Sequence, residues 1–208
     1  MKELFIKPHM FRRCVVLLIS VFFMGVGVAI FDQLGFGTDP CAMLNLGVSR
    51  LIGWSFGNWQ VLFNAMILVI ILALKEIRRI GLGSLANMIL VGYSADFASW
   101  VLNQVHPLNN ETLLVKSIIF VPTIVMFLIA VAFYMVVDLG VAPYDAMPQI
   151  IAGRQKKFSF TVIRIFWDIG VIIAGLLVGG TAGIVTIVLA FLAGPLISAI
   201  AKKFQRFF

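Results

Sequence analysis

Long apolar stretches separated by short polar segments dominate the chain. Six of these stretches are about 20 residues long, the length that an α-helix needs to cross the hydrocarbon core of a bilayer. They cover residues 13–31, 58–74, 82–102, 117–137, 160–178 and 181–201. The pattern predicts an all-α integral membrane protein with six transmembrane helices.

Two further apolar segments, Cys41–Leu51 and Ala146–Gly153, are too short to cross a bilayer. Each follows a Gly-x-x-Pro sequence, at Gly37–Pro40 and at Gly140–Pro143. Proline has no amide hydrogen, so each Gly-x-x-Pro turn leaves carbonyl groups free to bind something polar. We expect two short helices, broken or re-entrant, each preceded by an irregular turn.

Composition and charge support the membrane assignment. Of the 208 residues, 62% are hydrophobic and only 12% are charged, whereas soluble domains carry about 25% charged residues. The net charge of +7 alone would also fit a nucleic-acid partner, but the cations lie in loops on one side of the predicted spans. Thirteen of the sixteen lysines and arginines lie there: Lys2, Lys7, Arg12, Arg13, Lys75, Arg78, Arg79, Arg154, Lys156, Lys157, Lys202, Lys203 and Arg206.

The other side carries only Arg50 and Lys116, and Arg164 lies within a predicted span. Cytoplasmic loops of membrane proteins are rich in lysine and arginine. The distribution predicts a multi-pass membrane protein with both termini in the cytoplasm. No nucleic-acid partner is expected.

The chain contains an internal repeat with an offset of 102 to 104 residues. The two Gly-x-x-Pro sequences align with each other, and so do several small and polar residues that follow them. The further pairs are Ser55 with Ser159, Phe56 with Phe160, Asn64 with Asp168, Gly81 with Gly183, Ser84 with Thr186, and Gly92 with Gly194. The halves, residues 1–103 and 117–208, are joined by an outer linker at 104–116. Because each half has three spans, the halves enter the membrane from opposite sides, which predicts an inverted-topology repeat.

The sequence Leu139–Asp145 and its counterpart Gly35–Pro40 resemble the YczE/YyaS/YitT family of small bacterial membrane proteins. The likeness extends over Ser55–Gly57, Gly81–Ser84 and Gly194–Pro195. Where the family motif reads Gly-Pro-Arg-Asp-Gly, this chain has Ala-Pro-Tyr-Asp-Ala at 142–146. The resemblance implies a bacterial inner-membrane protein and names no ligand.

Two charged residues lie within one predicted span. Arg164 and Asp168 are four residues apart, so they share a helix face and lie within reach of each other. Charges in hydrocarbon cost about 2.5 to 3.5 kcal/mol on insertion scales and usually face a protein interior. The pair is either a structural link between helices or part of a binding site. The matched residues of the first half are the neutral Gln60 and Asn64.

Three polar residues lie where the short helices begin: Thr38 and Asp39 in the first half, and Asp145 in the second. An acidic residue there is either a helix cap or a ligand-binding group. Together with the residues of the two spans, they form the predicted substrate-binding set: Asp145, Arg164, Asp168, Asn64 and Gln60, with Thr38 and Asp39 on the outer side.

Catalytic and metal-binding motifs are not found in the sequence. The two cysteines, Cys14 and Cys41, and the two histidines lack metal-ligand spacing. Neither a P-loop, a Gly-x-Ser-x-Gly sequence nor a His-Glu-x-x-His sequence occurs. We expect no enzyme activity, no cofactor and no metal.

These features favour a small secondary transporter or permease. The arginine in the predicted site favours an anionic or zwitterionic solute. Two alternatives remain open, a substrate-binding membrane subunit of an ATP-driven vitamin importer and a non-transporting scaffold. The expected partners are the lipid bilayer, a small-molecule solute and, in a possible homodimer, a second copy of the chain.

Overall fold

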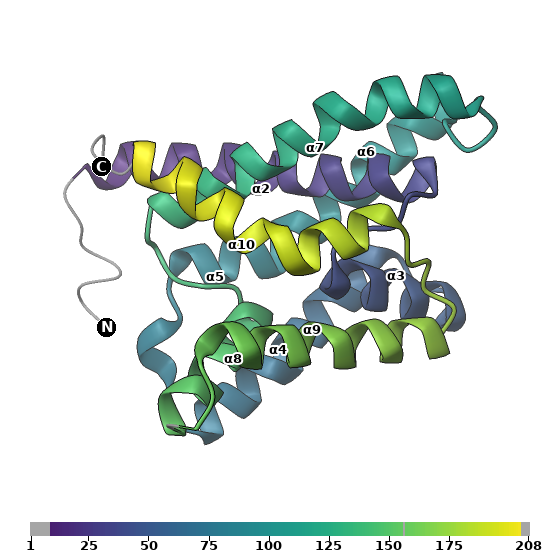
Figure 1. Ribbon diagram of the computed structural model, residues 1–208. Coiled ribbons are helices and arrows are strands. Elements are labelled where there is room, and N and C mark those ends of the chain that lie inside the picture. Colours follow the sequence, from purple (N-terminus) through teal and green to yellow (C-terminus); the bar gives the residue numbers. More distant parts are fainter. Residues whose placement is uncertain (1–8, 156, 205–208) are drawn as a thin grey trace.

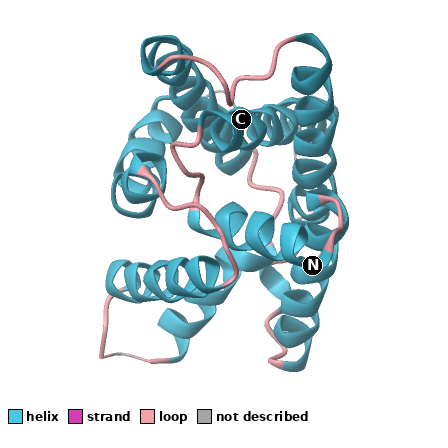
Figure 2. Cartoon of the chain, turned by 90° about the vertical axis from the view of Figure 1, so that its right-hand side faces the viewer, coloured by secondary structure: helices cyan, strands magenta, loops and turns pink. Residues whose placement is uncertain are grey.

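The computed structural model describes residues 9–155 and 157–204, and the side chains of 192–199, 201 and 202 lie outside that description. Within the described part the chain is helical and contains no strand (Figure 2). The helices are α2 (Met10–Leu34), α3 (Pro40–Ile52), α4 (Phe56–Ala73), η1 (Ile77–Arg79), α5 (Leu82–Ala86), η2 (Asn87–Val91), α6 (Gly92–Val105), α7 (Leu113–Val136), α8 (Pro143–Arg154), α9 (Phe160–Leu177) and α10 (Ile184–Phe204).

Five helical segments of the described residues are long and apolar enough to cross a membrane. They are α2, α4, the run Leu82–Val105, α7 and α9. Each coincides with one of the predicted spans. The run Leu82–Val105 contains one irregularity, because Asn87–Val91 forms a π-helical segment within it.

The helix α10 covers the sixth predicted span but begins at Ile184 rather than at residue 181. The preceding turn, residues 179–183, reads Gly-Gly-Thr-Ala-Gly, and the predicted span included its last three residues. Gly179 has a positive φ of 83°, and the Thr186 side chain accepts a hydrogen bond from the Gly183 amide at the helix start. Backbone conformation and capping therefore set the start of α10.

The two short helices of the prediction are present as α3, with 13 residues, and α8, with 12 residues. A proline opens each of them, at Pro40 and at Pro143. At about 1.5 Å per residue, they extend about 20 Å and 18 Å. Both are shorter than the hydrocarbon core of about 30 Å.

The helices pack in two groups with α3 between them (Figure 1). In the upper group, α2 packs on α6 and α7, and α7 packs on α10. In the lower group, α8 contacts α4 and α9. The short helix of each half packs against the long helix that follows the short helix of the other half, α3 on α9 and α8 on α4.

Two turns make matching hydrogen bonds with helix starts of the opposite half. The Gly83 amide donates to the Leu139 carbonyl at 2.7 Å, and the Val185 amide donates to the Phe36 carbonyl at 3.0 Å. These donors and acceptors are related by offsets of 102 and 103 residues. Each turn contains a glycine with positive φ, 80° at Gly37 and 112° at Gly140.

The start of α2 and the end of α10 lie at the same end of the bundle (Figure 1). Arg13 donates a hydrogen bond to the Val137 carbonyl at the end of α7, and the Phe204 ring lies 4.9 Å from that of Phe133. The linker lies at the opposite end, where the Leu108 amide bonds to Gln33. Of the predicted inner cations, Lys2, Lys7, Lys156, Arg206 and the Lys202 side chain lie outside the described residues.

Candidate functional site

A cavity of about 140 Å³ lies where the starts of α3 and α8 meet the two groups of helices. It is lined by residues from both halves of the chain. The lining residues are Met24, Val28, Asp39, Pro40, Cys41, Ala42, Gln60, Asn64, Asn87, Val91, Phe127, Val131, Ala142, Tyr144, Asp145, Arg164 and Leu189. A cavity of about 150 Å³ holds a molecule the size of benzene, so this one has room for about six non-hydrogen atoms.

Arg164 joins two carboxylates at one wall of the cavity. Its Nη1 donates to Asp145 Oδ1 at 2.6 Å, and its Nε donates to Asp168 Oδ2 at 2.8 Å. These charge-assisted bonds tie the first turn of α8 to the middle of α9. The second terminal nitrogen of the guanidinium, Nη2, has no hydrogen-bond partner among the described residues.

Tyr144 completes this charged cluster. Its hydroxyl donates to Asp168 Oδ1 at 2.7 Å, and its ring lies 5.5 Å below the Arg164 guanidinium. Asp168 is 2% exposed, so these two partners compensate its buried charge. The cluster contains two carboxylates and one guanidinium.

Two amide side chains of α4 also line the cavity. Gln60 is 5% exposed and Asn64 is 2% exposed. Asn64 Nδ2 donates to the Gln60 carbonyl at 3.0 Å, but no donor reaches Asn64 Oδ1. Within the described part of the chain, the Gln60 side chain also makes no hydrogen bond. These side chains therefore offer hydrogen-bonding capacity that the protein does not use.

The two short helices begin differently at the cavity. Asp39 caps α3, because its Oδ1 accepts a hydrogen bond from the Ala42 amide at 3.0 Å. Ala142 occupies the matching position of α8, where no side-chain cap is formed. Burial raises the pKa of Asp39 to about 6, although the bond from Ala42 opposes that rise. The helix α8 thus begins with uncapped amides at the cavity.

The structure brings together most of the residues that the sequence pointed to. Of the seven predicted residues, five line the cavity: Asp39, Gln60, Asn64, Asp145 and Arg164. Asp168 lies directly behind Arg164. Thr38 does not line this cavity, because its hydroxyl turns back to the Asp39 carbonyl at 3.3 Å.

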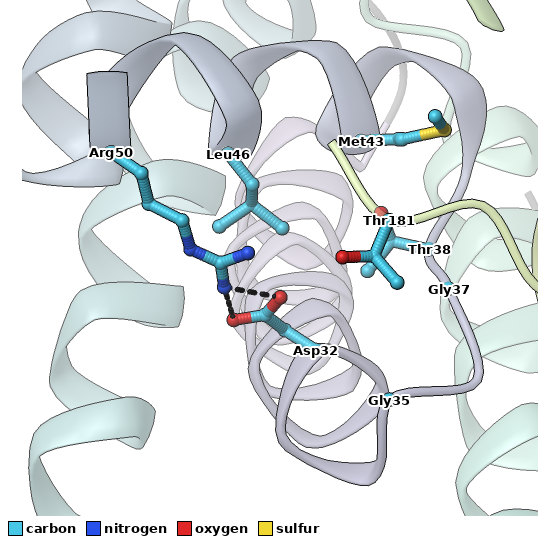
Figure 3. A pocket seen from close by; sticks show the side chains of 8 residues that line it. All are labelled: Asp32, Gly35, Gly37, Thr38, Met43, Leu46, Arg50 and Thr181. Carbon is cyan, nitrogen blue, oxygen red and sulfur yellow. Dashed lines mark hydrogen bonds and ion pairs between the residues drawn. The ribbon is translucent and has the colours of Figure 1, made fainter. Parts of the chain in front are cut away.

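Thr38 lies instead in a small pocket of about 10 Å³ at the end of α2 (Figure 3). There Asp32 accepts two hydrogen bonds from Arg50, at the last turn of α3. The pocket is too small for more than about one water molecule.

Three lining residues with polar or thiol side chains were not predicted from the sequence. Tyr144 directly precedes Asp145, where the family motif has arginine. Asn87 is a polar residue inside a predicted span, which is a signal for such a site, and it opens the π-helical segment. Such segments are frequent at functional sites. Cys41 forms part of the first turn of α3.

The described residues contain no group of three or more His, Cys, Asp or Glu side chains that is arranged to hold a metal ion. Three carboxylates and one guanidinium lie at or beside the cavity, together with two helix starts that carry partial positive charge.

The fold defines a multi-pass membrane protein with a polar cavity between its halves. The chain belongs to the family described as a family of unknown function (DUF6198), which matches residues 11–202. It is 27% identical over 193 residues to the uncharacterized protein YyaS of Bacillus subtilis, covering 91% of this chain and 92% of YyaS. An uncharacterized protein of Haemophilus influenzae is 25% identical over 190 residues, which cover 90% of this chain and 82% of that protein.

The uncharacterized membrane protein YczE of Bacillus subtilis is 24% identical over 158 residues, covering 76% of this chain and 70% of YczE. No solved structure matches the chain. The matches to YyaS and YczE confirm the family resemblance inferred from the Gly-x-x-Pro segments.

Proposed function

We propose that this protein is a small secondary transporter that binds its solute in the cavity between the two short helices. One observation carries the proposal: both short helices start at a single polar cavity, which is lined from both halves of the chain. Transporters bind substrates near the bilayer midplane, where discontinuous helices expose free amides and carbonyls. The proposal includes no chemical step.

The proposal includes an inverted-topology repeat of two three-span halves. Support comes from the matching hydrogen bonds of the two turns, Gly83 to Leu139 and Val185 to Phe36. In addition, Ser84 and Thr186 each accept a bond from the glycine three residues before them. The reciprocal packing of α3 on α9 and of α8 on α4 fits the same relation.

The proposed orientation places both termini in the cytoplasm of a bacterial inner membrane. The charge asymmetry of the loops supports it. The common location of the α2 start and the α10 end supports an even number of spans. In this orientation the Asp32–Arg50 pair lies at the outer end of α3, and Arg154, which bonds to the Leu74 carbonyl, lies at the inner end of α8.

The charge balance narrows the expected solute. Arg164 already pairs with Asp145 and Asp168, so its positive charge is largely compensated. A purely anionic solute would add a negative charge beside three carboxylates. Within the anionic or zwitterionic class expected from the sequence, the cavity therefore favours a zwitterion.

Cys41 provides a native probe of alternating access because it lines the cavity. In a Cys14→Ser background, Cys41 is the remaining cysteine of the chain. We expect a membrane-impermeant thiol reagent to label Cys41 from the outer face of proteoliposomes and, in separate inside-out vesicles, from the inner face. Preincubation with a transported solute should slow both reactions.

Labelling of Cys41 from one face only, under all solute conditions, would contradict a transporter and favour a scaffold or a one-sided binding subunit. The control is a Cys14→Ser, Cys41→Ser variant that carries a cysteine at Asn109, in the linker. That cysteine should react from the outer face only.

A further inference from the structure

We propose that the solute is a small amino acid, held with its carboxylate at the start of α8 and its ammonium group between Asp39 and the amides of α4. The inference rests on the proposed function, because it names the substrate class of the same cavity. The inference depends on the hydrogen-bond donors and acceptors of the cavity lining that have no partner within the described residues.

The carboxylate end is defined by the uncapped start of α8. Among the described residues, no acceptor is found for the backbone amides of Tyr144 and Asp145. An uncapped helix start binds anions through such amides and through its partial positive charge. Arg164 Nη2, which has no partner in the described part of the chain, adds a charged donor at the same wall.

The local backbone shows that α8 lacks a cap only because residue 142 is alanine. Ala142 has φ −53° and ψ 141°. Ser55 has −67° and 150°, Ser159 has −67° and 158°, and both serines cap their helices through the side-chain oxygen. A serine at 142 would have nearly the same backbone geometry for capping. The absence of a cap leaves the amides available to a ligand.

The ammonium end is defined by acceptors without donors. Asp39 uses Oδ1 for the cap of α3, and its Oδ2 has no donor among the described residues. Gln60 is 5% exposed, lines the cavity, and its side chain has no hydrogen-bond partner among the described residues. Asn64 Oδ1 also lacks a donor, but protein atoms enclose it, so Gln60 is the amide of α4 that is available to the ammonium group. A buried acceptor that lacks a partner is costly, and a ligand ammonium group supplies three donors.

The size of the cavity limits the solute. A volume of about 140 Å³ accommodates about six non-hydrogen atoms by comparison with benzene-sized cavities. Glycine and alanine fit within this limit. A solute with one charged group would satisfy one wall and leave the other unpaired.

The experiment measures binding to purified wild-type protein by ligand-induced shifts in Tm, with glycine, alanine, ethylamine and propionate as probes. A ligand that binds the folded state raises Tm by mass action. We expect glycine or alanine to bind at least about tenfold more tightly than ethylamine and propionate, because each monofunctional probe loses one set of charge-assisted bonds. Equal binding of ethylamine or propionate, or no shift with glycine and alanine, would overturn the inference.

Two variants of Ala142 test the carboxylate end. Ala142→Ser should cap α8, raise Tm without ligand and weaken alanine binding at least about tenfold, because its hydroxyl occupies the free amides. Ala142→Gly leaves these amides free and, unlike Ala142→Ser, should not raise Tm in the absence of ligand. Unchanged alanine binding by a folded Ala142→Ser protein would overturn the assignment of the carboxylate to α8.

Asp39→Asn tests the ammonium end, since asparagine preserves the cap of α3 but removes the charge. Alanine binding should weaken at least about tenfold, while propionate binding stays the same or improves. Unchanged alanine binding would overturn this half of the inference. Separate flux assays distinguish the two claims: alanine binding without flux refutes the transporter only, and flux of ethylamine or propionate without amino-acid binding refutes this inference only.

Discussion

The short helices α3 and α8 occupy matching places in the two halves but begin with different chemistry. Each starts at a proline after a glycine with positive φ. Asp39 caps α3 from within the chain, whereas Ala142 leaves α8 uncapped. The same kind of start, a proline after a glycine with positive φ, therefore carries a carboxylate cap in α3 and uncapped amides in α8.

The long helices that follow differ in the same way. The helix α4 presents the neutral Gln60 and Asn64, and α9 presents Arg164 and Asp168 at the positions offset by 104. The charged helix makes three side-chain bonds around Arg164 and Asp168. The neutral helix leaves acceptors open. The charged side chains of α9 compensate one another, whereas amide side chains of α4 have hydrogen-bonding groups without partners.

The largest predicted effect comes from breaking the charged helix. Arg164→Gln removes the partner of two carboxylates, one of them 2% exposed. Leaving a buried charge without its partner costs about 3–5 kcal/mol, so the free energy of unfolding in detergent should fall by about that amount. The matched change Gln60→Ala removes no hydrogen bond of the side chain and should cost less than half as much.

Adding Asp168→Asn to Arg164→Gln places glutamine and asparagine at the two positions of α9 that match Gln60 and Asn64 of α4. This double variant should recover more than half of the lost stability, because the stranded buried charge is gone. A double variant no more stable than Arg164→Gln would show that the ion pair is not the source of the loss. If the recovered protein still binds alanine as the wild type does, Arg164 and Asp168 are structural only.

The next effect tests the shared backbone of the halves. A Cβ at Gly37 or at Gly140 would clash with the backbone of Gly183 or of Gly81, and both glycines have positive φ. Alanine at either position should lower the free energy of unfolding by about 2 kcal/mol or more. Gly35→Ala, with φ 73° and open space around it, is the matched control and should cost about 1 kcal/mol. Very unequal losses of unfolding free energy at Gly37 and Gly140 would contradict the structural equivalence of the two turns.

A smaller effect concerns the pH dependence of binding at the capped helix. Because burial raises the pKa of Asp39 to about 6, this group is mostly protonated at pH 5 and mostly ionised at pH 7. An ammonium group needs the ionised form, so alanine binding should strengthen about tenfold between these pH values. Other charged groups near Asp39 are Asp145 on α8, and Arg164 and Asp168 on α9.

Asp39→Asn should remove that pH dependence. Stability should change in the opposite direction in the absence of ligand: the raised pKa destabilises the folded state progressively as pH increases from about 4 to about 6. The measurements are alanine titrations and Tm at pH 5, 6 and 7. A pH profile that is identical in Asp39→Asn would assign the titration to another group.

The smallest effects are expected at the C-terminal ends of the two short helices. Arg50 pairs with Asp32, and Arg154 bonds to the Leu74 carbonyl and lies 3.5 Å from Glu76. Both arginine side chains are about half exposed, 51% and 48%. Exposed pairs contribute about 0–1 kcal/mol, so Arg50→Gln and Arg154→Gln should each change the free energy of unfolding by less than about 1 kcal/mol. If only one of these variants lowered the free energy of unfolding by several kcal/mol, the ends of α3 and α8 would not be equivalent.

Apolar run length was sufficient to predict where the helices lie. Five predicted spans coincide with helical segments that are long and apolar enough to cross a membrane, and both short helices are present. Each begins at the proline that was expected in the preceding turn, at Pro40 rather than Cys41 and at Pro143 rather than Ala146, because proline fits the first position of a helix. The π-helical segment at Asn87 and the start of α10 at Ile184 were not predictable. Hydrogen-bond patterns and positive φ angles determine them.

The site was predictable where residues share a helix face. The spacing of Arg164 and Asp168 gave their pairing, which the structure shows at 2.8 Å. The bond from Arg164 to Asp145 depends on how α8 packs against α9, and no spacing reveals that contact. The direction of the Thr38 hydroxyl, away from the cavity, depends on the turn conformation.

The central claim is that the cavity carries a small amino acid across the membrane. Counterflow tests it most directly: proteoliposomes loaded with unlabelled alanine are diluted into radiolabelled alanine, with wild type, Ala142→Gly and Ala142→Ser compared. If the cavity transports alanine, label should accumulate transiently with wild type and with Ala142→Gly. The accumulated label should fall about tenfold or more with Ala142→Ser. Absence of accumulation with wild-type protein that binds alanine would contradict it.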